Sequence, residues 1–344
     1  MADGSTLVTD AQSASLTEHV TSFELGAHVT EACFLGGTAV FALGDGRIVL
    51  RQGGEDEREV AAHDGAVLVC AHDAKSLYSG GDDGRLIRSD ACGATEVIAE
   101  EKGKWIDAVA LSPSGALAWS SGRSVKVLDK SRKVKEATAP SSVRGLAFAP
   151  KGHRLAYAHN GGASLWFPNT KTEPEFLDWK GSHIDITFSP DGRFLVTSMQ
   201  ENALHGWNLA EKRHMRMTGY PAKSRSLSWS HDGKWLASSG AEACIIWPFT
   251  DKDGPMGKAP RECGVRNFRV TRVACHPKAF VVAIGYDDGC VLICRVTDGS
   301  ELLVRRASSL SGAISALAWD EEGARLAFGT QGGSAGWLDL PPVG

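Results

Sequence analysis

A repeat of about 40 residues constrains the fold of this chain more than any other feature. Three clear copies span residues 143–166, 184–207 and 224–247, and each predicts three strands joined by two tight turns, with Trp at the end of the third strand. Five weaker copies occupy the rest of the chain. The eight copies end at Leu50, Arg88, Leu128, Trp166, Trp207, Trp247, Cys294 and Trp337, so consecutive ends are 38 to 47 residues apart. The sequence therefore predicts eight units, or seven if one weak copy is not a unit of its own.

The residues of each copy predict small sheets that are not stable alone. Apolar side chains occupy alternate positions of the first strands, as at Val109 and Leu111 or at Leu146 and Phe148. A further strand-like segment follows most copies and completes a four-stranded sheet. Such a sheet exposes apolar faces that only its neighbours can cover, so the sheets are expected to stack in a closed ring.

Turn residues carry a resemblance to a known family. The first turn reads Ser-Pro-Asp-Gly at 189–192, Ser-Pro-Ser-Gly at 112–115 and Ser-His-Asp-Gly at 230–233, and Asp-Gly follows at the second turn of three units. Together with the terminal Trp of four units, this pattern resembles the WD40-repeat family, whose repeat is about 40–45 residues long. The resemblance implies an all-β fold, a WD40-like β-propeller of eight four-stranded blades, with seven as the alternative. The Trp-Asp signature itself is degraded, so no subfamily is favoured.

The resemblance also implies a structural role for the second-turn aspartates Asp45, Asp83 and Asp288. In the family, this Asp supports a hydrogen-bond network with a His before the first strand and a Ser or Thr in the second strand. His63, Ser79 and Asp83 match those positions. Cation binding by the acidic turns is the alternative, because hard cations prefer clustered carboxylates.

The two ends of the chain predict how the ring closes. The last unit ends at Leu340 and leaves too little chain for a fourth strand, whereas residues 17–25 are strand-like and have no other partner. We therefore expect one propeller domain over residues 17–340, in which residues 17–25 complete the last blade. Residues 1–16 are expected to form a flexible N-terminal tail, and residues 341–344 a C-terminal tail.

Composition restricts the partners and the compartment. The net charge of −4 gives no global reason to expect nucleic acid or an anionic membrane. No apolar run approaches the roughly 20 residues that span a bilayer, and the N-terminus lacks the basic and apolar regions of a signal peptide. The eight cysteines lack the spacing of a disulfide scaffold. These features predict a cytoplasmic protein that is not bound to a membrane, and they do not favour a nucleic-acid partner.

A search for catalytic and metal-binding patterns yields weak candidates. Gly332 to Gly336 match G-x-S-x-G, but they lie between two strands of one unit rather than on the strand-to-helix turn that a hydrolase needs. No phosphate-binding or dinucleotide-binding glycine pattern is present, and no cofactor is predicted. Zinc needs four converging ligands, or three and an open position. The weak metal candidates are His63, Cys70, His72, Cys275 and His276.

The segments that enter the first strands, with the second turns, are expected to line one face of the ring around its channel. The family uses this face for partners, and Arg, Trp and Tyr are enriched at the energetic centres of interfaces. The predicted partner-binding residues are Trp105, Asp107, Arg123, Arg144, His159, Asp185, Arg225, Arg272 and Tyr286. The arginines could converge on an acidic peptide or a phosphate; alternatively, they are solvated charges paired with Asp107 and Asp185.

The leading hypothesis is a non-catalytic scaffold that binds a protein or peptide on the channel face. The alternative is a propeller, an enzyme included, that handles a metal or a small ligand at a site in its channel.

Overall fold

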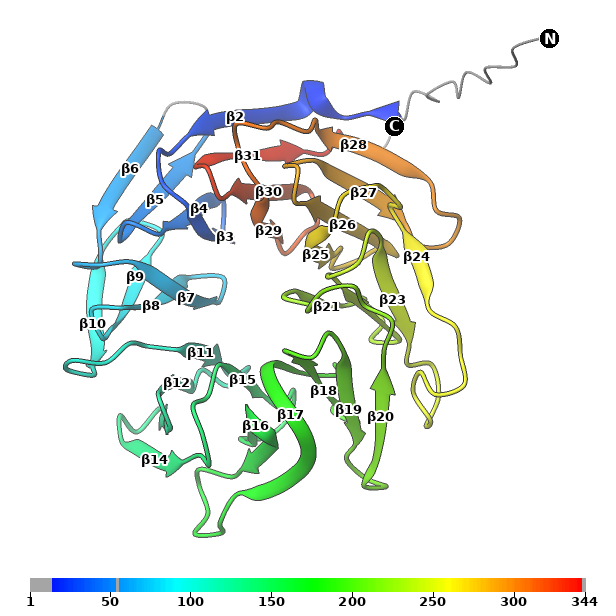
Figure 1. The fold of residues 1–344 in the computed structure, drawn as a ribbon. Coiled ribbons are helices and arrows are strands. Elements are labelled where there is room, and N and C mark those ends of the chain that lie inside the picture. The colour runs from blue at the N-terminus through cyan, green and yellow to red at the C-terminus, as the bar shows by residue number, and fades with distance from the viewer. Residues whose placement is uncertain (1–13, 54–55, 342–344) are drawn as a thin grey trace.

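The computed structural model describes residues 14–53 and 56–341, and these residues form a ring of β-sheets around a central channel (Figure 1). The first strand of each repeat lies at the centre of the ring, and later strands lie progressively outward. Consecutive first strands contact one another around the channel. We number the repeats as units 1 to 8 and call their strands first to fourth from the channel outward.

Units 1 to 3 and 6 to 8 each form a sheet of their own. In the first half of the ring, unit 1 contains β3 (Val29–Leu35), β4 (Thr38–Leu43), β5 (Arg47–Gln52) and β6 (Asp56–Ala61). Unit 2 contains β7 (Val67–His72), β8 (Ser76–Gly81), β9 (Arg85–Asp90) and β10 (Thr95–Glu100). Unit 3 contains β11 (Ala108–Leu111), β12 (Leu117–Ser121), β13 (Ser124–Leu128) and β14 (Val134–Thr138).

In the second half, unit 6 contains β21 (Leu227–Trp229), β22 (Trp235–Ser238), β23 (Cys244–Pro248) and β24 (Arg261–Cys263). Unit 7 contains β25 (Val270–Cys275), β26 (Val281–Tyr286), β27 (Val291–Arg295) and β28 (Glu301–Arg305). Unit 8 contains β29 (Ile314–Trp319), β30 (Arg325–Thr330) and β31 (Ser334–Asp339).

Units 4 and 5 share one six-stranded sheet, which contains β15 (Gly145–Phe148), β16 (Leu155–Trp166), β17 (Glu175–Phe188), β18 (Phe194–Met199), β19 (Leu204–Asn208) and β20 (Arg213–Met217). β17 is long and curved (Figure 1). Its residues 175–182 pair with β16, and its residues 183–188 pair with β18, so it is the fourth strand of unit 4 and the first strand of unit 5. β16 likewise supplies two strands, because Gly161 and Gly162, with φ of +88° and +146°, turn the chain between them.

The number of units and the number of sheets therefore differ. Within the described residues there are seven continuous hydrogen-bonded sheets, the lower of the two predicted numbers, and they contain eight repeats because one sheet joins two of them. The all-β propeller predicted from the sequence is confirmed.

The N-terminal strand closes the ring, as predicted. β2 (Val20–Glu24) pairs antiparallel with β31 from Val20↔Leu338 to Glu24↔Ser334. Phe23 on β2 packs against Phe41 of unit 1 and Trp337 of unit 8, with ring centroids 5.4 and 5.5 Å apart. The strand thus joins the last unit to the first.

The predicted tails are only partly described. Residues 1–13 and 342–344 lie outside the described residues. The remainder of the predicted N-terminal tail forms β1 (Ala14–Ser15), which pairs in parallel with β28 of unit 7. A short 3-10 helix, η1 (Thr17–His19), connects β1 to β2, and no described helix has the length and apolar character to cross a membrane.

Hydroxyl groups connect neighbouring first strands across the ring. Thr271 donates to the Ile314 carbonyl oxygen at 2.7 Å, Ser315 donates to the Val29 carbonyl oxygen at 2.6 Å, and Thr30 donates to the Val67 carbonyl oxygen at 3.1 Å. Large apolar side chains fill the spaces between sheets farther out; the largest that are fully buried include Trp119, Tyr157, Phe41, Phe194, Phe249 and Phe328. Each unit is therefore stabilised mainly by its neighbours.

Candidate partner-binding face

One face of the ring gathers the two kinds of loop that the sequence assigned to partner binding. We call it the channel face, and it contains the connections between a fourth strand and the next first strand together with the turns between second and third strands. Backbone hydrogen bonds hold these loops together, as from Ala139 to the Arg123 carbonyl (2.8 Å) and from Glu101 to the Gly84 carbonyl (2.8 Å). The channel face is thus a continuous surface built on rigid sheets.

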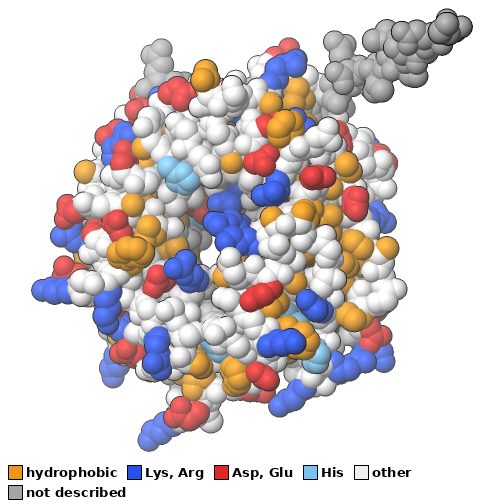
Figure 2. Space-filling view, viewed as in Figure 1, with side chains coloured by type: hydrophobic (Ala, Val, Ile, Leu, Met, Phe, Trp, Pro, Cys, Tyr) orange, Lys and Arg blue, Asp and Glu red, His pale blue; other side chains and the backbone are white. Residues whose placement is uncertain are grey.

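A hollow of about 690 Å³ opens on the channel face beside units 6, 7 and 8. Figure 2 shows Lys and Arg side chains gathered at a depression in the middle of the ring. The charged or titratable side chains that line the hollow are His28, Lys223, Arg225, Arg269, Arg272 and Asp287. Four cationic side chains therefore face one carboxylate, whereas the whole chain has a net charge of −4.

The arginines of the hollow form no ion pair within the described residues. Within the described residues, Arg225, Arg269 and Arg272 have no carboxylate oxygen within 4.0 Å. Arg272 donates to the carbonyl oxygen of Thr271 at 3.1 Å, and Asp287 accepts a hydrogen bond from the backbone amide of Arg269 at 3.0 Å. Because guanidinium groups form strong, directional bonds to carboxylates and phosphates, these arginines can receive an anionic ligand.

Burial shifts the pKa values of the charges inside the channel. Burial lowers the pKa of Arg272; the negative charge of Glu31 opposes this shift, and the positive charge of Arg225 adds to it. Burial raises the pKa of Glu31, and it raises the pKa of Asp185 to about 6, although a hydrogen bond from the backbone of Ile186 and the charge of Arg272 oppose the shift at Asp185. Since these carboxyl groups are less readily ionised than free ones, they neutralise the arginines less effectively.

The predicted pairing of the arginines with Asp107 and Asp185 does not occur within 4.0 Å in the described residues. Asp107 instead accepts a hydrogen bond from the backbone amide of Gly122 at 2.7 Å. The aspartate therefore orders a turn of unit 3 and does not neutralise the hollow.

Two predicted partner-binding residues are buried, and the structure removes both from the contact surface. His159 is fully buried, and its Nε2 lies 2.9 Å from the hydroxyl of Ser164. Tyr286 is also fully buried, and its hydroxyl donates to the carbonyl oxygen of Gly264. Both side chains fill space between strands because they point into the sheet packing instead of toward the channel face.

Trp105, Arg123 and Arg144 lie on the channel face but do not line the hollow. Trp105 is 59% exposed in the loop between units 2 and 3, and Arg144 is exposed before β15. Arg123 donates to the carbonyl oxygen of Ala139 at 2.9 Å and so helps to order the turn it belongs to. The nine predicted residues are therefore not one cluster, and only Arg225 and Arg272 line the hollow.

His63, Ser79 and Asp83 form a hydrogen-bonded chain of side chains. Nδ1 of His63 lies 3.1 Å from Asp83, and its Nε2 lies 2.8 Å from the Ser79 hydroxyl. Burial alone would raise the pKa of Asp83, but hydrogen bonds from the Arg85 amide and from His63 lower it. The network joins the turn of unit 2 to the end of unit 1. It occupies both ring nitrogens of His63.

The other second-turn aspartates also contact cationic side chains. Asp45 accepts a hydrogen bond from Nε of Arg47 at 2.8 Å. Asp288 binds both terminal nitrogens of Arg266, at 3.2 and 2.9 Å. These contacts order the turns.

The predicted metal candidates do not converge. Among residues 14–53 and 56–341, no group of three or more His, Cys, Asp or Glu side chains is arranged to hold a metal ion. Cys275 contacts the carbonyl oxygen of Ser228, and His276 uses Nε2 on the Gly323 carbonyl and Nδ1 on two backbone amides. Burial raises the pKa of the Cys70 thiol, and His72 is exposed at the end of β7. Metal chemistry gains no support from this geometry.

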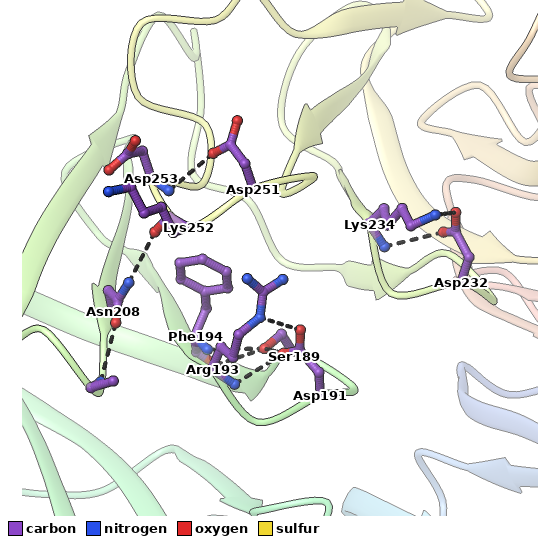
Figure 3. A network of polar contacts seen from close by, with 11 residues as sticks. Ser189, Asp191, Arg193, Phe194, Asn208, Asp232, Lys234, Asp251, Lys252 and Asp253 are labelled. Atoms are coloured by element: carbon purple, nitrogen blue, oxygen red, sulfur yellow. Dashed lines mark hydrogen bonds and ion pairs between the residues drawn. The ribbon is translucent and has the colours of Figure 1, made fainter.

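On the opposite face, polar side chains are used to stabilise turns. Figure 3 shows the Ser189–Asp191 turn, where the Ser189 hydroxyl donates to Asp191 at 2.7 Å and accepts from the Phe194 amide at 2.9 Å. The same view includes Asn208, whose amide donates to the carbonyl oxygen of Lys252 at 2.9 Å. The carboxylate and amide groups in this region are therefore already occupied within the chain.

Sequence reasoning missed an aromatic cluster between units 4 and 5. Trp179 stacks on His205 with ring centroids 3.9 Å apart and planes 16° apart, and Trp207 contacts the same imidazole edge to face at 4.6 Å. His205 is fully buried, and neither of its ring nitrogens has a hydrogen-bond partner in the described part of the chain. The only sequence signal was the concentration of His and Trp between residues 179 and 214.

Comparison with known proteins agrees with this architecture. The family model described as "WD domain, G-beta repeat" matches residues 213–247, which run from β20 through the third strand of unit 6. Residues 213–247 are thus similar to a WD40 repeat, and the ring of sheets is a WD40-like β-propeller. No subfamily is indicated.

The relatives are similar to a limited part of this WD40 propeller. WD repeat-containing protein 1-B of Xenopus laevis is 33% identical over 86 residues, which cover 24% of this chain and 14% of that protein. WD repeat-containing protein 1 of Xenopus tropicalis is 31% identical over the same coverage. The matched segment is thus a small fraction of the length of these relatives.

A solved structure shows the same fold over nearly the whole chain. The computationally designed Ika8 protein superimposes with a TM-score of 0.76 and 16% identity, covering 92% of this chain and 98% of that one. At this identity the likeness establishes the fold alone.

Proposed function

We propose that this WD40 propeller is a non-catalytic scaffold that binds a protein or peptide on its channel face. The observation that carries the proposal is the hollow, where Arg225, Arg269 and Arg272 have no carboxylate partner within 4.0 Å in the described residues. A surface that holds several cations close together gains free energy when an anionic group enters it, and it attracts such a partner from a distance. The bound feature is an acidic motif.

The surrounding structure supports this site over others. The hollow lies on the face that resembles the partner surface of the family, and it is built on rigid first strands, which reduces the ordering cost of binding. The eight cysteines are all free in the structure, which fits a protein of the cytoplasm. We accordingly assign the partner to that compartment.

Charge reversal in the hollow tests the proposal. A library of displayed peptides is selected on immobilised wild-type protein and on a variant that combines Arg225→Glu and Arg269→Glu. Peptides rich in Asp and Glu are expected to be enriched on the wild type and not on the variant, because the reversed charges repel them.

A matched control separates local from global charge. The control combines Lys130→Glu and Lys171→Glu, which change net charge equally but lie in exposed loops of the opposite face. This control is expected to select the same peptides as the wild type. Enrichment of the same acidic peptides on the Arg225→Glu, Arg269→Glu variant, with an unchanged melting temperature, would remove the hollow from the function.

A further inference from the structure

Three exposed apolar side chains lie in the loops that border the hollow. Val265, Phe268 and Leu310 are 66%, 45% and 93% exposed. They belong to two consecutive loops of the channel face, between units 6 and 7 and between units 7 and 8. Large apolar groups that remain in water next to a cavity commonly mark a binding surface.

These loops are held firmly in place, so the exposure is a fixed property of the surface. The guanidinium of Arg266 binds Asp288 through two hydrogen bonds and lies over the Phe268 ring, 5.2 Å from its centroid. The backbone amide of Ser308 donates to the carbonyl oxygen of Asp288 at 3.0 Å. One turn of unit 7 therefore anchors both loops.

The apolar side chains and the cations belong to one surface. Phe268 directly precedes Arg269, and Leu310 lies two residues before Gly312; both Arg269 and Gly312 line the hollow. The hollow itself lies beside units 6 to 8 instead of symmetrically around the channel. Charge and apolar surface are thus concentrated in the same sector of the ring.

We propose that the partner segment combines acidic and large apolar residues and binds across units 6 to 8. Its carboxylates enter the hollow beside Arg225 and Arg269, and its apolar side chains cover Val265, Phe268 and Leu310. This inference rests on the proposed function and narrows it, because it leaves Trp105, on the far side of the channel face, outside the contact.

Other occupants fit the surface less well. A free phosphate would engage the arginines but leave the apolar side chains in water. A second copy docked face to face would bring the same four cations into opposition, which is unfavourable. A peptide with both kinds of residue satisfies the charge of the hollow and covers the apolar loops together.

Synthetic peptides and single substitutions test the inference. The probes are fluorescent ten-residue peptides of three compositions: Asp and Glu with Leu and Phe; Asp and Glu with Ser; and Asn and Gln with Leu and Phe. Binding to the full-length protein is measured by fluorescence anisotropy. The first peptide class is expected to bind at least about tenfold more tightly than either of the others, since only it meets both parts of the surface.

Substitutions then locate the apolar contact. Phe268→Ala and Leu310→Ser are each expected to weaken the first class about five- to tenfold and to leave the weak binding of the second class unchanged. Trp105→Ala is the matched control, an aromatic residue on the same face that is more exposed than Phe268, and it is expected to change binding by less than about twofold. All three positions are exposed, and unchanged melting temperatures confirm that the variants are folded.

The outcomes distinguish this inference from the proposed function. If the first two classes bind equally and Phe268→Ala has no effect, the apolar contact is refuted while the acidic site remains. If neither acidic class binds, the proposed function fails as well. A loss of binding with Trp105→Ala equal to that with Phe268→Ala would overturn the restriction to units 6 to 8, and self-association that depends on Phe268 would identify a second copy as the occupant instead.

Discussion

His205 offers the sharpest test of the packing described above, because a polar ring is buried there without a partner. Both ring nitrogens lack hydrogen bonds in the described part of the chain, and burial lowers the pKa of the ring to about 3. His205→Phe keeps a flat ring against Trp179 and removes the two polar atoms. An unsatisfied buried polar group costs about 1–3 kcal/mol, whereas the larger ring adds some strain. We expect the free energy of unfolding at pH 7.5 to rise by about 1–2 kcal/mol.

The pH dependence of the free energy of unfolding gives a second, independent test of the state of His205. In the folded protein the ring stays neutral down to about pH 3, whereas in the unfolded chain it titrates near 6.5. Below pH 6.5 the unfolded state therefore binds a proton that the folded state does not, and stability falls as the pH falls. One group contributes at most about 1.4 kcal/mol per pH unit, so between pH 6.5 and pH 4.5 this His removes up to about 3 kcal/mol. His205→Phe should abolish that part of the acid sensitivity.

The assay is urea unfolding followed by tryptophan fluorescence and circular dichroism at pH 7.5, 6.0 and 4.5. His183→Phe is the matched control in the same cluster, since His183 hydrogen-bonds to Thr197 at 2.7 Å and to the Trp179 carbonyl at 3.1 Å. Removing those bonds is expected to destabilise by about 1–3 kcal/mol. If His205→Phe destabilises the protein as much as the control does, or retains the wild-type acid sensitivity, the assignment of His205 as an unpaired neutral ring is refuted.

Three further predictions concern closure and turns. Deleting residues 1–25 removes β2 and should lower the melting temperature severely in a thermal scan, whereas deleting residues 1–13 leaves β1 and β2 in place and should change it little. Asp83→Ala should lower the free energy of unfolding at pH 7 by about 1–3 kcal/mol. Because the pKa of Asp83 is lowered in the folded protein, the difference from wild type should shrink as acid protonates the carboxylate. Equal differences at pH 7 and pH 3 would contradict this. Gly84→Ala should destabilise far more than Gly103→Ala in urea unfolding, because both have positive φ but a Cβ at Gly84 would lie 2.4 Å from the Glu101 carbonyl oxygen, whereas Gly103 faces open space.

The architecture could be predicted because its determinants are local and repeated. Turn residues such as Asp191 with Gly192, and a Trp at the end of the third strand, recur in several units, and the spacing of about 40 residues extends the pattern to the others. The joined sheet of units 4 and 5 could not be predicted. It depends on the hydrogen bonding of residues 175–188 as one continuous curved strand, and no residue type in that segment signals continuity.

The candidate site was predicted at the level of the face but not of the individual residues. Arg225 and Arg272 were found because cations at the start of first strands are visible in the sequence. The apolar side chains Phe268 and Leu310 were not found, because an isolated apolar residue in a loop has no periodicity that distinguishes it from a core residue. These residues can be identified as candidate contact residues only from the positions of their loops beside the hollow.

The residues that enter the channel are selected by a backbone irregularity that alternation cannot predict. In five units the pairing of the first strand with the second shifts register near its start, as between Val270 and Arg272, between Val29 and Glu31 and between His183 and Asp185. Such a bulge adds one residue and redirects the side chains around it. At Thr271 the added residue donates its hydroxyl to the next unit, and Arg272, which follows it, reaches the hollow. A strictly alternating strand would not place Arg272 in this way. The bulge therefore both joins neighbouring units and determines that the Arg272 side chain faces the channel. Neither effect can be deduced from the other residues of the strand.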